Sequence, residues 1–261
     1  MTAEQPMPAD VKLMNLSAAV LYAGVVALLT TALASWASNH QAFALRAIVM
    51  GGDLVHNNVV TVRANVAPRL GGTFFTMDLG RARTVFETLP WVRRAVVQRE
   101  FPNRLRVLLQ EQKAVAYWGA EGEDSLVNSF GEEFEANVGE VDQESLPRFT
   151  GPEGQAAAML TMYQALARRF EPMDMVIEQL DLTHRGGWRT RLDSGAVIEL
   201  GAGPMAEVLG RTDRFLKTVT QVTSRYGRTV QALETADLRH KDGYAIRVEG
   251  VITLTPEVKG K

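Results

Sequence analysis

The sequence predicts a membrane-anchored protein with an α+β body. One long apolar run near the N-terminus predicts a single transmembrane helix, and residues 43–117 follow a β-α-α-β-β pattern typical of a small mixed domain. The remainder is rich in short strand patterns, interrupted by two amphipathic helices. We expect those two helices to pack on a mostly antiparallel sheet.

The apolar run has no Asp, Glu, Lys or Arg between Lys12 and Arg46. A helix over Leu13–Ala37 would be about 37 Å long, enough to cross a hydrocarbon layer of about 30 Å with some tilt. Trp36 lies where an interfacial aromatic residue would anchor the far end. The flanking charges, Lys12 and Arg46, are too few to set the orientation.

Two other interpretations of this run remain. A cleaved signal peptide would have a shorter apolar core, although Ala32-Leu33-Ala34 imitates a cleavage site. A buried helix of a soluble protein would show a polar stripe. We expect an uncleaved anchor over residues 13–37, preceded by a tail over residues 1–12.

Composition argues against several kinds of function. The formal net charge is −2, which does not favour nucleic-acid binding, and there is no cysteine for a disulfide, a thiolate metal site or a nucleophile. The four histidines are widely separated. We therefore expect no metal site. We find no catalytic constellation and no cofactor motif, although a Ser–His–Asp triad, which is spatial, stays open.

The first domain is expected to begin with a strand over Phe43–Met50 and a helix over Val59–Val66. Asp78 is a suitable N-cap for a second helix over Leu79–Leu89, which Pro90 ends. Strands over Val92–Phe101 and Leu105–Tyr117 follow, and Trp91 is expected in the core.

The second domain is expected over residues 118–248, with a flexible tail over residues 249–261. Its predicted helices cover Gln155–Phe170 and Met205–Tyr226, and its last two strands cover Leu233–Arg239 and Tyr244–Val248. Four further strand patterns are expected at residues 126–128, 175–184, 188–192 and 196–200.

Several short motifs occur in a fixed order along this chain. Leu89-Pro90-Trp91-Val92 and Phe101-Pro102-Asn103-Arg104-Leu105 lie in the first domain, and Leu146-Pro147, Gly151-Pro152-Glu153-Gly154 and Asp237-Leu238-Arg239 lie in the second. With the N-terminal anchor, this order resembles the FtsQ/DivIB family of bacterial cell-division proteins from about Leu13 to Val248. The first two motifs are similar to the polypeptide-transport-associated (POTRA) domain of that family.

The resemblance implies a non-catalytic divisome assembly protein of the bacterial inner membrane. Its N-terminal tail would be cytoplasmic, and its body would lie in the periplasm at the division septum. Its partners would be FtsB and FtsL-type proteins, through which it would control septal peptidoglycan synthesis. It would bind no nucleic acid and no small-molecule substrate.

The resemblance also implies a binding site at the C-terminal sheet edge, where family members bind FtsB by strand addition and pair an arginine with an acid. Arg239 and Gly243 match that pattern, whereas His240 stands where the family often has Tyr. The strand that begins at Tyr244 would supply the open edge. Arg185 and Trp188 are further candidates, and an ordinary hairpin that closes the sheet is the alternative.

Other interpretations need features that are weak in this sequence. An anchored periplasmic POTRA-type chaperone would normally continue into a membrane barrel, and a cell-wall enzyme would need a catalytic constellation. Gly201-Ala202-Gly203-Pro204-Met205-Ala206 fits a dinucleotide-binding pattern formally, but Pro204 removes an N–H donor, so we interpret it as a turn before a helix. Arg104 and Arg106 would share one strand face, suited to an acidic partner, anionic lipid or simply solvent.

Overall fold

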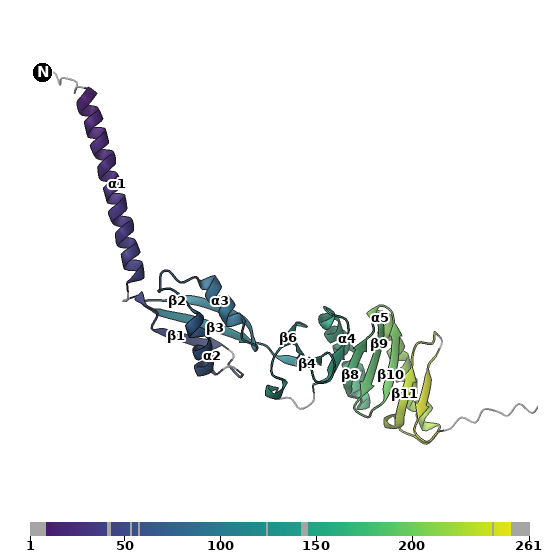
Figure 1. Cartoon of the computed structure of the whole chain (residues 1–261). Helices are drawn as coiled ribbons and strands as arrows, with labels where there is room; N and C mark the ends of the chain where they lie inside the picture. The colour runs from purple at the N-terminus through teal and green to yellow at the C-terminus, as the bar shows by residue number, and fades with distance from the viewer. Residues whose placement is uncertain are drawn as a thin grey trace, which may run out of the picture. The chain divides into compact units, whose positions relative to one another are not determined.

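The computed structural model of the chain describes residues 9–40, 43–52, 54–56, 58–123, 125–141, 146–241 and 243–251 (Figure 1). The chain forms two compact units, of which the first ends at Glu111 and the second begins at Gln112. Residues 1–8 of the expected N-terminal tail and residues 252–261 of the expected C-terminal tail lie outside the described part.

The N-terminal helix α1 spans Ala9–Asn39. Its section Leu13–Trp36 has 24 residues and a mean hydropathy of 2.0, and all of these residues are exposed. The hydroxyl groups of Thr30 and Thr31 donate hydrogen bonds to backbone carbonyls one turn earlier in the helix. Because the backbone groups of a helix are bonded within it and this section is apolar on all sides, it fits a single-pass membrane protein and not a helix in a soluble core.

The first unit continues with a three-stranded sheet and two helices. The elements are β1 (Ala47–Gly52), α2 (Val59–Val66), α3 (Leu79–Glu87), β2 (Val92–Glu100) and β3 (Arg104–Glu111). The strand order is β1-β3-β2, in which β1 runs parallel and β2 antiparallel to the central β3. This is the predicted β-α-α-β-β order.

Local sequence explains where both helices begin. The side chain of Asn58 accepts a hydrogen bond from the backbone N–H of Val60 at the start of α2. Asp78 Oδ1 accepts from the N–H groups of Gly80, at 2.8 Å, and Arg81, at 3.1 Å, at the start of α3. Each cap satisfies backbone donors that have no partner inside the helix.

The core of the first unit lies between the two helices and one face of the sheet. It is made by alternate residues of β3 and by the apolar residues of α2 and α3, among them Val62, Val66, Ala82, Phe86, Leu105, Val107 and Leu109. Trp91 is buried, as predicted, and its ring stacks on that of His56 with 3.9 Å between centroids.

The second unit is built on a nine-stranded sheet with the order β12-β11-β10-β9-β8-β7-β4-β5-β6 (Figure 1). Five of its neighbouring pairs are antiparallel and three are parallel, so the sheet is mostly antiparallel as predicted. The strands are β4 (Ala114–Trp118), β5 (Ser125–Asn128), β6 (Glu133–Glu135), β7 (Arg148–Thr150), β8 (Ile177–Leu182), β9 (Gly187–Leu192), β10 (Val197–Ala202), β11 (Leu233–Asp237) and β12 (Ala245–Val248).

Two helices pack on this sheet, α4 (Ala156–Phe170) and α5 (Met205–Ser224). Met159, Leu166 and Phe170 of α4 and Phe215 and Val219 of α5 belong to one continuous core with the strands. The large apolar area buried in this core makes it the main source of stability for the second unit.

One predicted strand is wrong. The sequence pattern predicts a single strand over Leu105–Tyr117, but the structure divides it into β3 and β4 at Gln112 and Lys113. β3 pairs inside the first sheet, whereas β4 pairs with β5 and β7 of the second. The predicted end of the first domain, after Tyr117, therefore falls inside a strand of the second unit. A continuous apolar alternation does not reveal that its two halves pair with different sheets.

Other predicted ends differ by a few residues. The first strand begins at Ala47 and not at Phe43, and α3 ends at Glu87, two residues before Leu89. The strand predicted to reach Arg239 ends at Asp237, and the last strand begins at Ala245. The backbone at these ends joins turns, whose hydrogen bonds a hydrophobic pattern does not encode.

Candidate partner-binding edge

The strand β12 forms one edge of the nine-stranded sheet. It pairs with β11 in an antiparallel register that sets Ala245 opposite Asp237 and Val248 opposite Leu233. Within the described residues no strand pairs with its other side. An edge of this kind presents backbone N–H and C=O groups that an added strand can bind.

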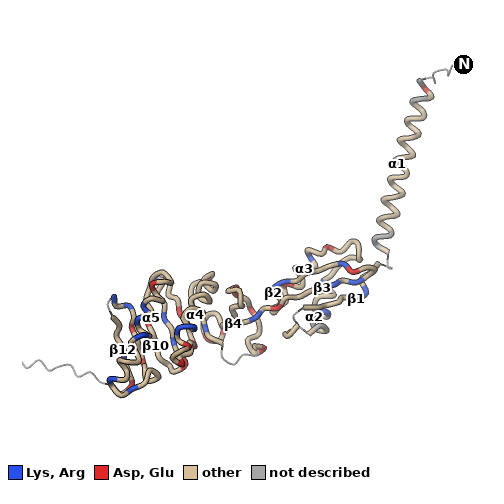
Figure 2. Tube along the Cα trace, turned by 180° about the vertical axis from the view of Figure 1, so that it is seen from behind, with Lys and Arg blue, Asp and Glu red and all other residues tan. Residues whose placement is uncertain are grey.

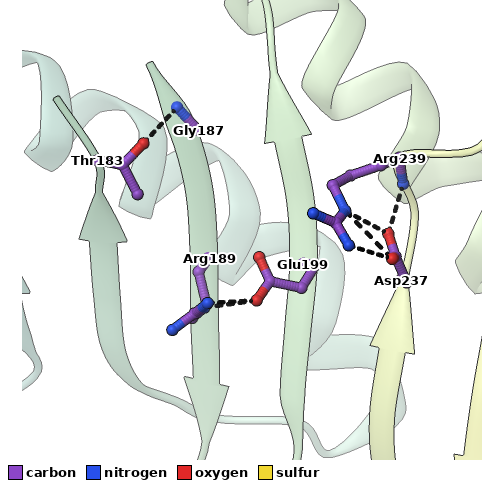
Figure 3. Close-up of polar contacts among 6 residues, drawn as sticks. All are labelled: Thr183, Gly187, Arg189, Glu199, Asp237 and Arg239. Carbon is purple, nitrogen blue, oxygen red and sulfur yellow. Dashed lines mark hydrogen bonds and ion pairs between the residues drawn. The ribbon is translucent and has the colours of Figure 1, made fainter. Parts of the chain in front are cut away.

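Arg239 lies just beyond the end of β11 and is paired inside the chain. Its Nη2 donates to Asp237 Oδ2 at 2.6 Å, its Nε to Oδ1 at 2.9 Å, and its backbone N–H to Oδ1 at 3.0 Å (Figure 3). These hydrogen bonds lower the pKa of Asp237 to about 2. The Arg239 side chain is still 61% exposed, so a second acid can approach the rest of its guanidinium group.

Gly201 provides the surface on which the Arg239 side chain lies. A Cβ at Gly201 would stand 3.0 Å from Arg239 Cγ, and the residue has φ +81. A glycine is required here because an L side chain would meet both the strained backbone conformation and the arginine stem. Leu238, between Asp237 and Arg239, is buried, and its N–H donates to the carbonyl of Glu199 at 2.8 Å.

The glycine-rich segment before α5 is a turn that another arginine holds. Arg211 Nε donates to the carbonyl of Leu200 at 2.9 Å, and its Nη2 donates to that of Ala202 at 2.7 Å. β10 belongs to an antiparallel pair with β9, and Pro204 is the N-cap of α5. These contacts match the predicted turn before a helix.

Tyr244 points toward α5. Its hydroxyl group lies 2.7 Å from the hydroxyl of Thr218, and its ring makes an edge-to-face contact with Phe215 at 5.1 Å between centroids. The ring is half-buried, so it positions the chain that enters β12. Tyr244 therefore joins the edge to the helix that covers the sheet.

A groove of about 290 Å³ lies beside this contact. Gly243 and Tyr244 line it together with residues of α5 and the end of the β11 segment, namely Arg211, Arg214, Lys217, Thr218 and Leu238. Arg214 and Lys217 are exposed, and among the described residues neither has an ion-pair partner. The groove next to β12 is therefore electropositive and suited to an acidic segment.

The remaining predicted residues lie in different places. His240 is exposed directly after Arg239. Arg185 is exposed in the turn between β8 and β9, and Trp188 is buried in the core on β9, three strands away from β12. Arg239 and His240 thus follow the end of β11, and Gly243 and Tyr244 precede β12, whereas Arg185 and Trp188 do not lie at this edge.

Sequence reasoning missed a row of charged side chains that leads to the edge. In the sheet register Asp181, Arg189, Glu199 and Asp237 lie side by side across β8, β9, β10 and β11, and Ala245 of β12 is next in line. Arg189 Nη2 lies 2.6 Å from Glu199 Oε1. Figure 3 draws this ion pair. The alternation of charged and apolar residues in each strand could have indicated these side chains. Which of them are neighbours depends on the strand order, which the alternation does not give. Among the described residues no group of three or more His, Asp or Glu could hold a metal ion.

Comparison with known proteins gives a consistent result for both units. Residues 43–112 match the family model of the FtsQ-type POTRA domain, and residues 116–239 match that of the FtsQ/DivIB C-terminal domain. The chain is 43% identical to the cell division protein FtsQ of Burkholderia pseudomallei over 97% of its length and 98% of that protein. It is 37% identical to FtsQ of Thiomonas arsenitoxydans, over 95% of this chain and 91% of that protein, and 38% identical to FtsQ of Bordetella pertussis, over 95% and 94% respectively. The chain therefore belongs to the FtsQ/DivIB family of bacterial cell-division proteins.

Proposed function

We propose that this protein is a non-catalytic assembly factor of the divisome, which recruits and links FtsB and FtsL-type partners and so controls septal peptidoglycan synthesis. The observation that carries the proposal is the side of β12 with which no described strand pairs. An extended segment of the partner adds to that side as a further antiparallel or parallel strand. The backbone supplies affinity, and the flanking side chains supply specificity.

Charges beside the edge favour an acidic partner segment. Arg239 uses its Nε and one terminal nitrogen for Asp237, and its other terminal nitrogen is left for an acid of the partner. Arg214 and Lys217 add positive charge on the groove that begins at Gly243. His240 takes the place next to Arg239 and adds a polar ring to the same surface.

Charge reversal tests the role of Arg239. We expect Arg239→Glu to weaken binding of an FtsB segment by at least about 30-fold, because a partner acid would then face two carboxylates, that of Asp237 and the one introduced by the substitution. Arg191→Glu is the matched control, since Arg191 is an exposed arginine on β9, away from the edge. The measurement is isothermal titration with the full chain in detergent. Equal affinities of the two variants would contradict the proposed contact.

Proline substitution tests the edge itself. Successive residues of a strand direct their N–H groups to opposite sides of it. Of the two variants Ala245→Pro and Ile246→Pro, one therefore removes a donor that faces β11, and the other removes a donor that faces the side without a described strand. We expect the second variant to keep the melting temperature of the parent and to lose partner binding. If both variants fold and bind with parental affinity, strand addition at β12 is wrong.

A further inference from the structure

Four phenylalanines form a cluster at the end of the first unit where β1 begins. Phe43 precedes β1, Phe74 and Phe75 precede α3, and Phe101 follows β2. The ring centroids lie 4.9 Å apart for Phe43 and Phe75, 5.2 Å for Phe74 and Phe75, and 6.2 Å for Phe74 and Phe101. We call these four residues the aromatic patch.

One ring of the patch is buried in the first unit, and two of its rings are exposed. Phe74 is 7% exposed, whereas Phe75 is 50% and Phe101 75% exposed. Arg99 of β2 donates from Nε to the carbonyl of Phe74 and from Nη2 to that of Met77, both at 2.6 Å. The N–H of Phe74 donates to the carbonyl of Phe43 at 2.8 Å. Two large exposed apolar rings, on a backbone that these hydrogen bonds hold, indicate an interaction surface.

The chain connects this patch to the apolar helix by a short segment. α1 ends at Asn39, and the N–H of Phe43 donates to the carbonyl of His40 at 3.0 Å. Four residues span at most about 14 Å at roughly 3.5 Å per residue. Phe43 therefore stays within about that distance of the end of α1, and the other three rings follow it through the ring contacts given above.

Two exposed arginines follow members of the patch by three residues, Arg46 after Phe43 and Arg104 after Phe101. The register sets Arg104 opposite Ala47, the residue after Arg46. Among the described residues neither arginine has an ion-pair partner, and the nearby Glu100 is bound to Arg106 at 2.7 Å. Figure 2 shows further arginine positions along β2 and β3. Aromatic rings with arginines beside them fit the headgroup layer of a membrane that contains anionic lipid.

We propose that the aromatic patch docks on the surface of the bilayer that α1 spans, with Phe75 and Phe101 at headgroup depth and Arg46 and Arg104 bound to lipid phosphate. This contact fixes the first unit against the membrane. It is independent of the partner edge on β12 and rests only on the membrane anchor.

Spin labelling of the full chain in liposomes of phosphatidylcholine and phosphatidylglycerol tests this contact. The chain has no cysteine, so a single introduced cysteine gives one labelled site. Asn103→Cys reports on the patch, since the carbonyl of Asn103 accepts from the N–H of Arg46. Val55→Cys is the control: Val55 is 76% exposed, and its N–H donates to Glu111, at the opposite end of β3.

The measured quantity is the ratio of the label's collision rate with oxygen to its collision rate with a water-soluble nickel chelate. We expect this ratio to be severalfold higher for the label at position 103 than for the label at position 55. Phe75→Ser with Phe101→Ser should bring position 103 to the ratio of position 55, and liposomes without phosphatidylglycerol should lower it. If the double variant has a lowered melting temperature, the single variant Phe101→Ser replaces it in this comparison. Equal ratios at both positions would overturn the proposal, as would a high ratio at 103 that survives the serine substitutions. Shielding that appears only when other membrane proteins are added would assign the patch to a protein partner instead.

Discussion

At the scale of single residues, the pair Asp237 and Arg239 makes the stability of the second unit depend on pH. The pKa of Asp237 falls from 3.8 to about 2 in the folded chain because Arg239 donates hydrogen bonds to it. A depressed carboxyl pKa contributes stability above the unfolded value, and this contribution is lost as the pH falls from about 4 toward 2. We expect Asp237→Asn to destabilise the second unit at pH 7 by about 0.2–1 kcal/mol, the range for an exposed pair.

The difference in stability between the parent and this variant should disappear as the pH approaches 2. Chemical unfolding of both proteins between pH 7 and the lowest pH at which both stay folded measures it. Arg239→Gln provides the matched control, since it removes the same pair from the other side and should give a similar pH profile. A difference between parent and Asp237→Asn that stays constant with pH would contradict the assignment.

At the scale of elements, the start of α3 depends on one side chain. Asp78 satisfies two of the backbone N–H groups at this end, and α3 supplies Ala82 and Phe86 to the core. We expect Asp78→Ala to lower the free energy of unfolding of the first unit by about 0.5–2 kcal/mol, and Asp78→Ser, which also caps a helix, to lower it much less. Thermal unfolding of the two variants compares them, and equal losses would show that the cap contributes through its charge.

At the scale of the whole molecule, the proposed topology rests on the apolar helix and on membership of the FtsQ/DivIB family. We propose that residues 1–12 are cytoplasmic, that the chain beyond about Asn39 is periplasmic, and that the helix is not cleaved. A reporter that is active only in the periplasm should be active when it is fused after Lys261. The N-terminus of the mature protein should be Met1 or Thr2.

Two results would contradict this topology. An N-terminus directly after Ala34 would identify the apolar run as a cleaved signal peptide. An inactive periplasmic reporter, together with an active cytoplasmic reporter at the same position, would reverse the orientation. The two charges that flank the helix, Lys12 and Arg46, favour neither orientation by themselves.

The sequence by itself determined those features that nearby residues control. The apolar run, the cap at Asp78, the bounds of α2 and the β-α-α-β-β order could be predicted, because a cap, a helical face or a hydrophobic segment needs only residues close in the chain. The family resemblance also predicts a binding segment around Arg239, and this stays a prediction. Which strand pairs with which could not be predicted from nearby residues.

Only the tertiary structure decided which strands meet. It divided the alternating run Leu105–Tyr117 between two sheets, and it left β12 at an edge. It also placed the Arg239 stem on Gly201, 38 positions earlier in the sequence, and paired its guanidinium with Asp237. Strand order depends on contacts between residues far apart in the chain, and a strand pattern looks the same whether its neighbour is another strand of the chain, a partner or water.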